Sequence, residues 1–138
     1  TQPDPARWRE VLFNYMLFEP VIDSEILPSL PITAIAAGAS SDVDVLVGAT
    51  AEEWRFFIVP NNVIDMINDD MLAFAVIAYG LSPDEALTVY REALPGAGAG
   101  DLQAALVTDW FFRISAIRLA EAHTAGKEAT YMYFFACR

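Results

Sequence analysis

Cysteine is almost absent from this sequence of 138 residues, in which Cys137 is the only one. A single thiol excludes an intramolecular disulfide and a metal cluster built on cysteines, and it suits a reducing environment. We therefore expect a cytoplasmic location. Histidine is as scarce, because His123 is also the only one of its kind.

Basic residues are few as well, with 8 Lys and Arg against 19 Asp and Glu and a net charge of −11. Binding to nucleic acid or to an anionic membrane surface depends largely on basic side chains. Long apolar runs are also missing, since none approaches the roughly 18 residues that a membrane-spanning helix needs. Residues 1–5 lack the basic-then-apolar order of a secretory signal. We therefore expect neither nucleic acid nor a membrane as a partner.

Hydrophobic residues, in contrast, are abundant. They make up 55% of the chain, and the mean hydropathy is +0.34, which is high for a free-standing soluble domain of this length. Such an excess indicates either an unusually large core or surfaces that pack against further protein. We favour the second interpretation.

Two apolar, β-prone segments, 43–48 and 130–135, predict buried strands. Between them the pattern predicts helices over 68–78, 82–94 and 101–126. A long helical crossover between two buried strands implies a parallel pair with a right-handed connection. Two strands alone do not make a stable sheet of this class. The sequence therefore predicts part of an α/β fold.

Helix starts have their own signals. Asn68 and Asp101 are predicted N-caps, and Ser82 with Glu85 forms a predicted capping box. The last helix is expected to place one apolar stripe on a single face. That stripe consists of Leu102, Leu106, Trp110, Ile114 and Ile117.

The residues before the first strand are less regular. Aromatic residues at near-helical spacing occur within 6–18, and prolines make 20–31 an extended loop. Residues 33–38 are alanine-rich and predict one or two helical turns.

Two carboxylates, Glu52 and Glu53, follow the first predicted strand at the end where open α/β sheets hold their sites. They either cap the following turn or belong to a site. The pattern alone favours a cap.

Several short blocks lie in a fixed order along nearly the whole chain. They are 18–23, Leu27-Pro28 with Pro31, 45–48 followed by Glu53 and Phe56-Phe57, 109–113, and 131–135. In this order and at this spacing, they resemble the type-B carboxylesterase and cholinesterase family, especially its bacterial, para-nitrobenzyl-esterase-like members. The sequence departs from the family at Ser24, where the family often has glycine, and at Ser115, where it often has proline.

This resemblance implies part of an α/β-hydrolase fold, with two late parallel strands and a Ser–His–Glu triad. It assigns the triad acid to Glu53, whose carboxylate would accept the imidazole N–H and stabilise the imidazolium. Phe56 and Phe57 fall at pocket positions of the family. They are expected either to line an acyl or alcohol pocket or to belong to the core.

The other members of the triad are missing. The family nucleophile lies in a Gly-x-Ser-x-Gly turn after a strand. The nearest match, 38–42, ends in Asp42 and precedes the strand, so we interpret it as a linker. His123 lies before the final strand, and we expect it on a solvated helix face or at the helix C-terminus. Residues 1–138 are therefore expected to be a fragment of one catalytic domain, with the nucleophile upstream and the histidine downstream.

The expected parent protein is a serine hydrolase that splits small-molecule carboxylic esters through an acyl-enzyme. This chain would supply the acid and be inactive alone, and its partner would be the remainder of the hydrolase domain. The resemblance implies no metal or organic cofactor. The exposed sheet edge predicts self-association. Two alternatives stay open: a non-catalytic, cholinesterase-like interaction domain, and an independent small α/β domain.

Overall fold

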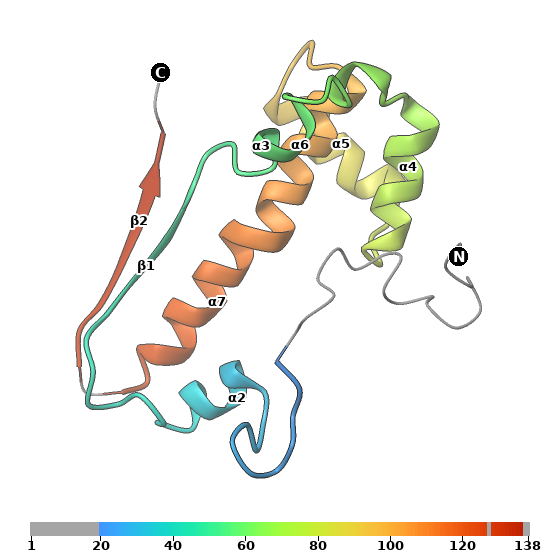
Figure 1. The fold of residues 1–138 in the computed structure, drawn as a ribbon. Helices are drawn as coiled ribbons and strands as arrows, with labels where there is room; N and C mark the ends of the chain where they lie inside the picture. The colour runs from blue at the N-terminus through green and yellow to red at the C-terminus, as the bar shows by residue number, and fades with distance from the viewer. Residues whose placement is uncertain (1–19, 127, 137–138) are drawn as a thin grey trace.

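The computed structural model describes residues 20–126 and 128–136. The predicted aromatic segment at 6–18 and Cys137 lie outside this part of the chain. The described residues form two neighbouring parts (Figure 1). One consists of a pair of strands with the last helix of the chain along it, and the other is a layer of further helices at one end of that pair.

The two strands are β1 (Val45–Thr50) and β2 (Thr130–Phe135), and they run parallel with Val45 opposite Thr130 and Thr50 opposite Phe135. This confirms the predicted parallel pair joined by a helical crossover. β1 begins two residues later than the predicted start at residue 43. The reason is that pairing starts where the partner strand arrives, at the bond from the Val45 amide to the Ala129 carbonyl (2.9 Å).

Gly48 lies directly opposite Tyr133 in this pair. A Cβ atom at position 48 would overlap the Tyr133 carbonyl oxygen and lie 2.7 Å from its ring. The glycine therefore allows the ring of Tyr133 to cover the backbone of β1.

Before the strands lies α2 (Pro31–Ala36), which begins two residues earlier than the predicted 33–38. Pro31 opens this helix instead of closing the preceding loop, because proline is well suited to the first helical position. In that loop, the Asp23 carboxylate accepts backbone N–H groups from Leu27 (2.8 Å) and its neighbours, and these bonds hold the pKa of Asp23 below its usual value. The next residue, Ser24, has a φ of 65°, a conformation that favours glycine.

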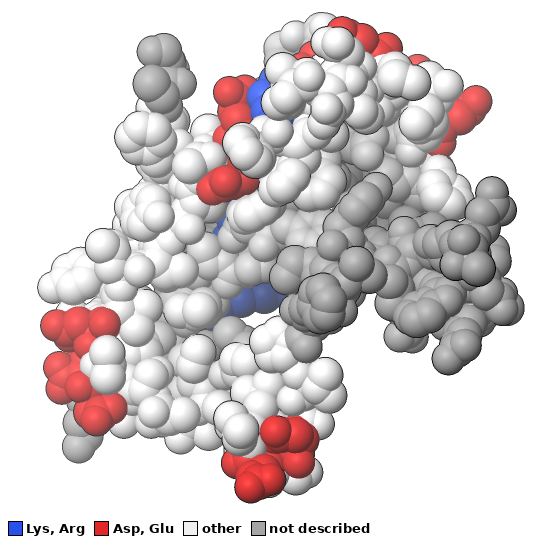
Figure 2. All heavy atoms as spheres, viewed as in Figure 1, with Lys and Arg blue, Asp and Glu red and all other residues white. Residues whose placement is uncertain are grey.

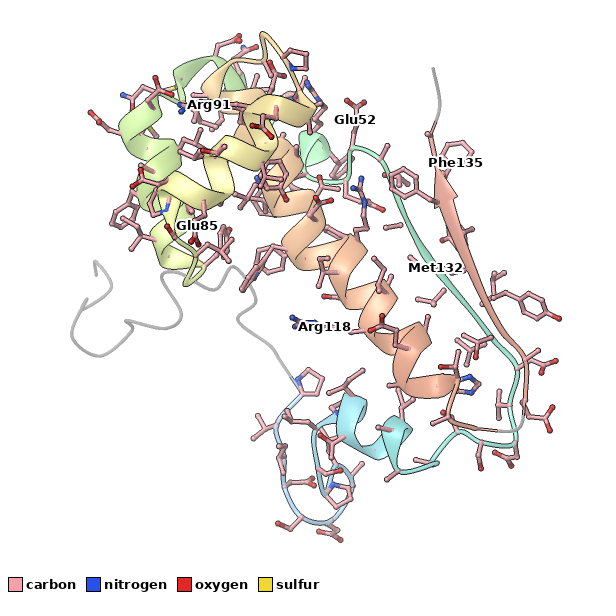
Figure 3. The ribbon with its side chains drawn as sticks, turned by 180° about the vertical axis from the view of Figure 1, so that it is seen from behind. Glu52, Glu85, Arg91, Arg118, Met132 and Phe135 are labelled. Carbon is pink, nitrogen blue, oxygen red and sulfur yellow. The ribbon has the colours of Figure 1, made fainter. Side chains whose placement is uncertain are left out.

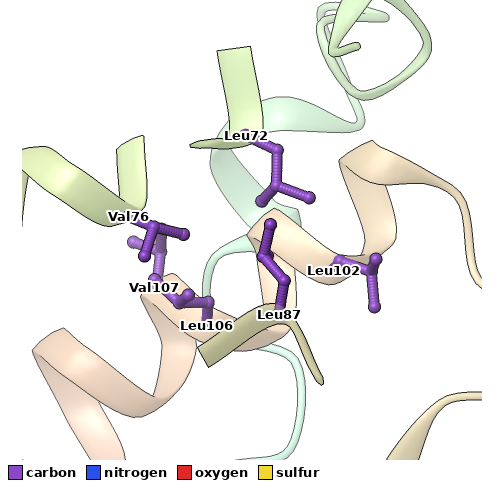
Figure 4. Packing of buried hydrophobic residues seen from close by; sticks show 6 residues of the cluster. All are labelled: Leu72, Val76, Leu87, Leu102, Leu106 and Val107. Carbon is purple, nitrogen blue, oxygen red and sulfur yellow. The ribbon is translucent and has the colours of Figure 1, made fainter. Parts of the chain in front are cut away.

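Six helical segments follow β1 before the helix against the strands begins. Their bounds are α3 (Arg55–Ile58), the 3₁₀ segment η1 (Ile64–Met66), α4 (Asp69–Ala78), α5 (Pro83–Ala93), α6 (Ala99–Thr108) and the π-helical segment η2 (Asp109–Arg113). The helix α7 (Ile114–His123) then leads to β2. The main core lies among α4, α5 and α6 (Figure 4). It consists of Leu72, Val76, Leu87, Leu102, Leu106 and Val107.

The predicted cap is confirmed at Asn68 and wrong at Asp101, whereas Ser82 is at the predicted N-cap position of α5 without the predicted capping bond. The Asn68 side chain accepts the Met71 amide at 2.9 Å, as expected of an N-cap. Ser82 precedes α5 but makes no side-chain cap, since this end is exposed and water can bind the free amides. Asp101 lies inside α6, which Gly98 caps instead, because the Asp101 carboxylate is paired with Arg55.

The predicted helix over 101–126 is interrupted, and its apolar stripe does not stay on one face. Leu102 and Leu106 are almost fully buried, whereas Trp110 is 42% exposed and Ile114 is 39% exposed. The wider π turn of η2 changes the direction in which later side chains point, so the regular helical period fails there. As a result, α6 packs in the helical layer while α7 packs along the strands.

The surface retains many large apolar side chains. Tyr131, Met132, Tyr133, Phe134 and Phe135 of β2 are all between 44% and 60% exposed. Acidic side chains gather near the ends of the molecule, and the surface along β2 between them carries few charges (Figure 2). Over the described residues, no single helix is long and apolar enough to cross a membrane, although α4 and α5 together pass by length and composition across a bend of 117°.

Candidate functional site

The turn that carries Glu53 leaves the carboxyl end of β1. The last bond between the strands runs from the Ala51 amide to the Phe135 carbonyl (2.9 Å), so the turn begins where pairing ends. Figure 3 shows Glu52 at this end of β1, with Phe135 at the corresponding end of β2. The predicted position of the carboxylate pair, just beyond the strand, is thus the position observed.

Glu53 is partly buried, and its side chain folds back onto the strand. Its Oε1 atom accepts the backbone N–H of Thr50 at 2.7 Å. Within residues 20–126 and 128–136, no hydrogen bond reaches the other oxygen, Oε2. The carboxylate is therefore oriented by one bond and has one oxygen available as an acceptor.

Glu52 has a different environment from its neighbour. Its side chain is 65% exposed and forms an ion pair with Arg55, at 2.9 Å from Oε1 to Nε. The guanidinium of Arg55 also contacts Asp101 on α6. Glu52 thus belongs to an exposed charge network that joins α3 to α6, whereas Glu53 is held by the backbone.

Trp54, which follows Glu53, is held by α6 and η2. Its backbone N–H donates to Thr108 Oγ1 at 3.0 Å. Its indole stacks on the ring of Phe111, with centroids 5.8 Å apart and planes at 7°. The sequence did not point to Thr108, and the only available signal was a threonine directly after two apolar residues of a buried stripe.

Phe56 and Phe57 follow on α3, and their rings meet edge to face with centroids 5.3 Å apart. Phe56 is 77% exposed and Phe57 is 49% exposed, so neither ring is enclosed by the described part of the chain. The prediction that they line a substrate pocket stays a prediction.

A cavity of about 620 Å³ lies between this turn, α5 and α6. Glu52 and Arg55 contribute to its wall, but Glu53, Phe56 and Phe57 do not. On the opposite wall, the hydroxyl of Tyr90 donates to Asp109 at 2.8 Å, and burial together with this carboxylate raises the pKa of Tyr90 well above its usual value.

Within the 109–113 block, Asp109 and Arg113 form contacts with other elements of the fold. Asp109 pairs with Arg113 at 2.9 Å, and the Arg113 guanidinium lies 4.4 Å from the centre of the Phe134 ring. These contacts connect η2 to β2, and with the Tyr90 bond they connect it to α5 as well. The block therefore has a structural role in joining the helical layer to the strands.

His123 lies at the C-terminus of α7, one of the two places expected for it, but the expectation of a solvated face is wrong, because this side chain is only 2% exposed. Its Nδ1 atom lies 2.7 Å from Thr130 Oγ1, and its Nε2 atom lies 3.0 Å from the Ser40 carbonyl oxygen. The reason for the error is that the loop between α2 and β1 covers the end of α7, a contact between segments 83 residues apart. In the neutral ring, Nε2 carries the hydrogen because the Ser40 carbonyl can only accept.

His123 lies far from Glu53 along the strands. Its partner Thr130 begins β2, opposite Val45, whereas Glu53 follows the other end of β1. Residues 38–42 lie near His123 in the turn between α2 and β1, which agrees with a linker and not with a nucleophile turn. In the described part of the chain, no three His, Cys, Asp or Glu side chains are grouped in a way that could hold a metal ion.

Comparisons with known proteins point to a single family. A model of the carboxylesterase family matches residues 2–138. The chain is 28% identical over 104 residues to the cAMP-regulated D2 protein of Dictyostelium discoideum, a match over 75% of this chain and 19% of that protein. It is 37% identical over 54 residues to the para-nitrobenzyl esterase of Bacillus subtilis (strain 168), a match over 39% of this chain and 11% of that protein.

Solved structures show the same likeness. The carboxylesterase EST55 of Geobacillus stearothermophilus at pH 6.2 superposes with a TM-score of 0.78 and 27% identity, over 96% of this chain and 28% of that chain. The same enzyme at pH 6.8 gives a TM-score of 0.69 and 26% identity. The chain thus has part of an α/β-hydrolase fold, and it spans between about a tenth and just over a quarter of the length of these proteins.

The environment of His123 leads to a prediction about stability. Replacing it (His123→Ala) should lower the free energy of unfolding by about 2–4 kcal/mol, because a cavity forms and the Ser40 carbonyl loses its donor. Urea denaturation of the chain measures this loss. The control is Glu121→Ala on the exposed face of the same helical turn, which should change stability little. Equal stabilities for the two variants would contradict the buried network.

Proposed function

The chain belongs to the carboxylesterase family, and from this membership we propose that the whole protein is a serine hydrolase that splits carboxylic esters, with Glu53 as the acid of its triad. The observation that carries the proposal is the geometry of Glu53. The Thr50 amide fixes one carboxylate oxygen at the carboxyl end of β1, and the second oxygen is available to a further donor.

In the proposed reaction, that donor is the N–H of a histidine outside this chain. The carboxylate holds the imidazole in one tautomer and stabilises its charged form. The histidine takes the proton of a serine as the serine oxygen attacks the ester carbonyl, and it gives this proton to the departing alcohol. Water then attacks the acyl-enzyme with the same histidine as base, and the carboxylic acid is released.

Phe56 and Phe57 are proposed to contact the ester. They lie three and four residues beyond Glu53, and their rings remain largely exposed on α3. Aromatic side chains at the mouth of such a site would provide an apolar surface for the acyl or alcohol group. The remainder of the hydrolase would cover their free faces.

The proposed role of Glu53 is tested in the full-length hydrolase by Glu53→Gln. The amide keeps the shape but cannot stabilise an imidazolium, so kcat should fall by roughly 10³- to 10⁴-fold. Glu52→Gln is the matched control, because Glu52 is exposed and paired with Arg55, and its kcat should stay close to that of the unmodified protein. An active Glu53→Gln variant would contradict the assignment and favour the non-catalytic, interaction-domain alternative.

The chain alone is proposed to be inert, since a triad without its nucleophile and base retains only weak catalysis. Incubation with a fluorophosphonate, followed by intact-mass measurement, should show no adduct on residues 1–138. The full-length protein should show one adduct per molecule. A stoichiometric adduct on the isolated chain would mean that one of its own serines is an activated nucleophile.

Isolated, the chain is also proposed to self-associate through its strand edges. Each strand of the pair has one unpaired edge within the described part, and β2 exposes a row of apolar side chains. Light scattering should give a mass above 15.2 kDa that rises with concentration. Met132→Lys on β2 should reduce this association, whereas Val89→Lys on the exposed side of α5 should not. A monomer at every concentration would refute the proposal.

A further inference from the structure

We propose that Thr108 and Phe111, at the junction of α6 and η2, are positioning residues for the turn over residues 51–54. This turn carries Glu53 and is called the acid turn below. The two residues do not reach the carboxylate of Glu53. They hold Trp54, its neighbour, by the backbone and by the ring, and so fix the direction of the turn that carries Glu53. This inference rests on the proposed role of Glu53.

Thr108 is the stronger of the two anchors. Its side chain belongs to a residue that is only 1% exposed, and its hydroxyl oxygen is the acceptor of the Trp54 amide. Trp54 precedes the first residue of α3, so its N–H has no acceptor within that helix. The Trp54 amide is partly buried, so losing its acceptor would cost folding free energy, and this requirement holds residue 54 against α6.

Phe111 holds the same residue through its side chain. The indole of Trp54 lies nearly parallel to its ring, and Phe57 contacts the indole at 4.9 Å between centroids. Thr108 is the last residue of α6 and Phe111 lies in η2, so both contacts to Trp54 come from one junction of the chain. Trp54 is thus bound at two points by a single surface.

The π-helical segment makes this arrangement compatible with the rest of the fold. α6 must face the core formed with α4 and α5, whereas α7 must lie along β1 and β2. The wide turn of η2 changes direction between them, and the Ser115 hydroxyl donates to the Trp110 carbonyl at 3.5 Å within this region. π-helical turns are often found at functional sites. Here the turn lies against the acid turn, with Thr108 immediately before it.

The ion pair from Arg55 to Asp101 also joins the acid turn to α6, but it is a weaker anchor. Both side chains are more than a third exposed, at 35% and 39%, and exposed ion pairs contribute little. Buried Thr108 is therefore the group whose loss should move the turn.

The test uses the full-length hydrolase with Thr108→Val and Thr108→Ser. Valine keeps the shape of threonine but removes the acceptor, and serine keeps the acceptor. Because small misplacements of catalytic groups are costly, we expect Thr108→Val to lower kcat by about tenfold or more, with KM nearly unchanged. Thr108→Ser should retain most of the activity that Thr108→Val loses. Phe111→Leu, which removes only the ring contact, should lower kcat by a smaller factor.

The pH profile separates positioning from a general loss of stability. A carboxylate beside the catalytic histidine raises the pKa of that imidazole, so a displaced Glu53 should lower it. The acid limb of kcat/KM should then move to lower pH in Thr108→Val. The control is Val107→Ala, at a fully buried neighbour that packs in the core among α4, α5 and α6. It should lower stability and leave both kcat and the pH profile unchanged.

Glu53→Gln, measured in parallel, distinguishes the two ways in which the inference can fail. If Glu53→Gln is inactive while Thr108→Val keeps its kcat and pH profile, the positioning role is refuted and the proposed function stands. If Thr108→Val and Val107→Ala lose activity alike, Thr108 contributes only stability and the inference is again refuted. If Glu53→Gln is fully active, the proposed function fails, and the positioning role fails with it.

Discussion

Backbone pairing between β1 and β2 is the interaction on which the rest of the structure depends. It joins segments that are far apart in the sequence, since Val45 pairs with Thr130, and a side-chain bond from the Ala129 amide to the Asp44 carboxylate, across 85 residues, lies just before the pair. The helices between the two strands must therefore form a crossover that brings the chain back beside β1. The pairing also fixes the point at which the chain leaves the sheet, because its last bond, from Ala51 to Phe135, directly precedes the acid turn. The pairing with β2 therefore fixes the position of the turn that carries Glu53.

Beyond that point, two adjacent glutamates show how environment separates residues of the same type. Glu52 points into an exposed network with Arg55, and Glu53 is bent back to the Thr50 amide. The bond to Thr50 is what a turn-capping side chain would make. The capping interpretation and the catalytic one are therefore compatible, because a carboxylate has two oxygens and the cap occupies only one of them.

The sequence predicted the strands well, since a β-branched or aromatic run carries its own signal, and the bounds of β2 match the predicted 130–135. Glu53 was predicted to be the triad acid only through the family resemblance, and this assignment stays a prediction. Three features left little or no local signal: the π turn of η2, the burial of His123 and the bond from the Trp54 amide to Thr108. Each depends on contacts with a distant segment, such as the loop that covers His123. Periodicity along one helix cannot report on such contacts.

The bond between Trp54 and Thr108 also has a consequence for the order of events during synthesis. The two residues are 54 positions apart, so the acid turn cannot adopt its final form until α6 has emerged. At about 5–20 residues per second, that delay lasts several seconds. Contacts of such long range also slow folding after synthesis. Pairing between β1 and β2 comes later still, because β2 follows α6 in the sequence, so the turn that carries Glu53 is among the last parts of this region to reach its final form.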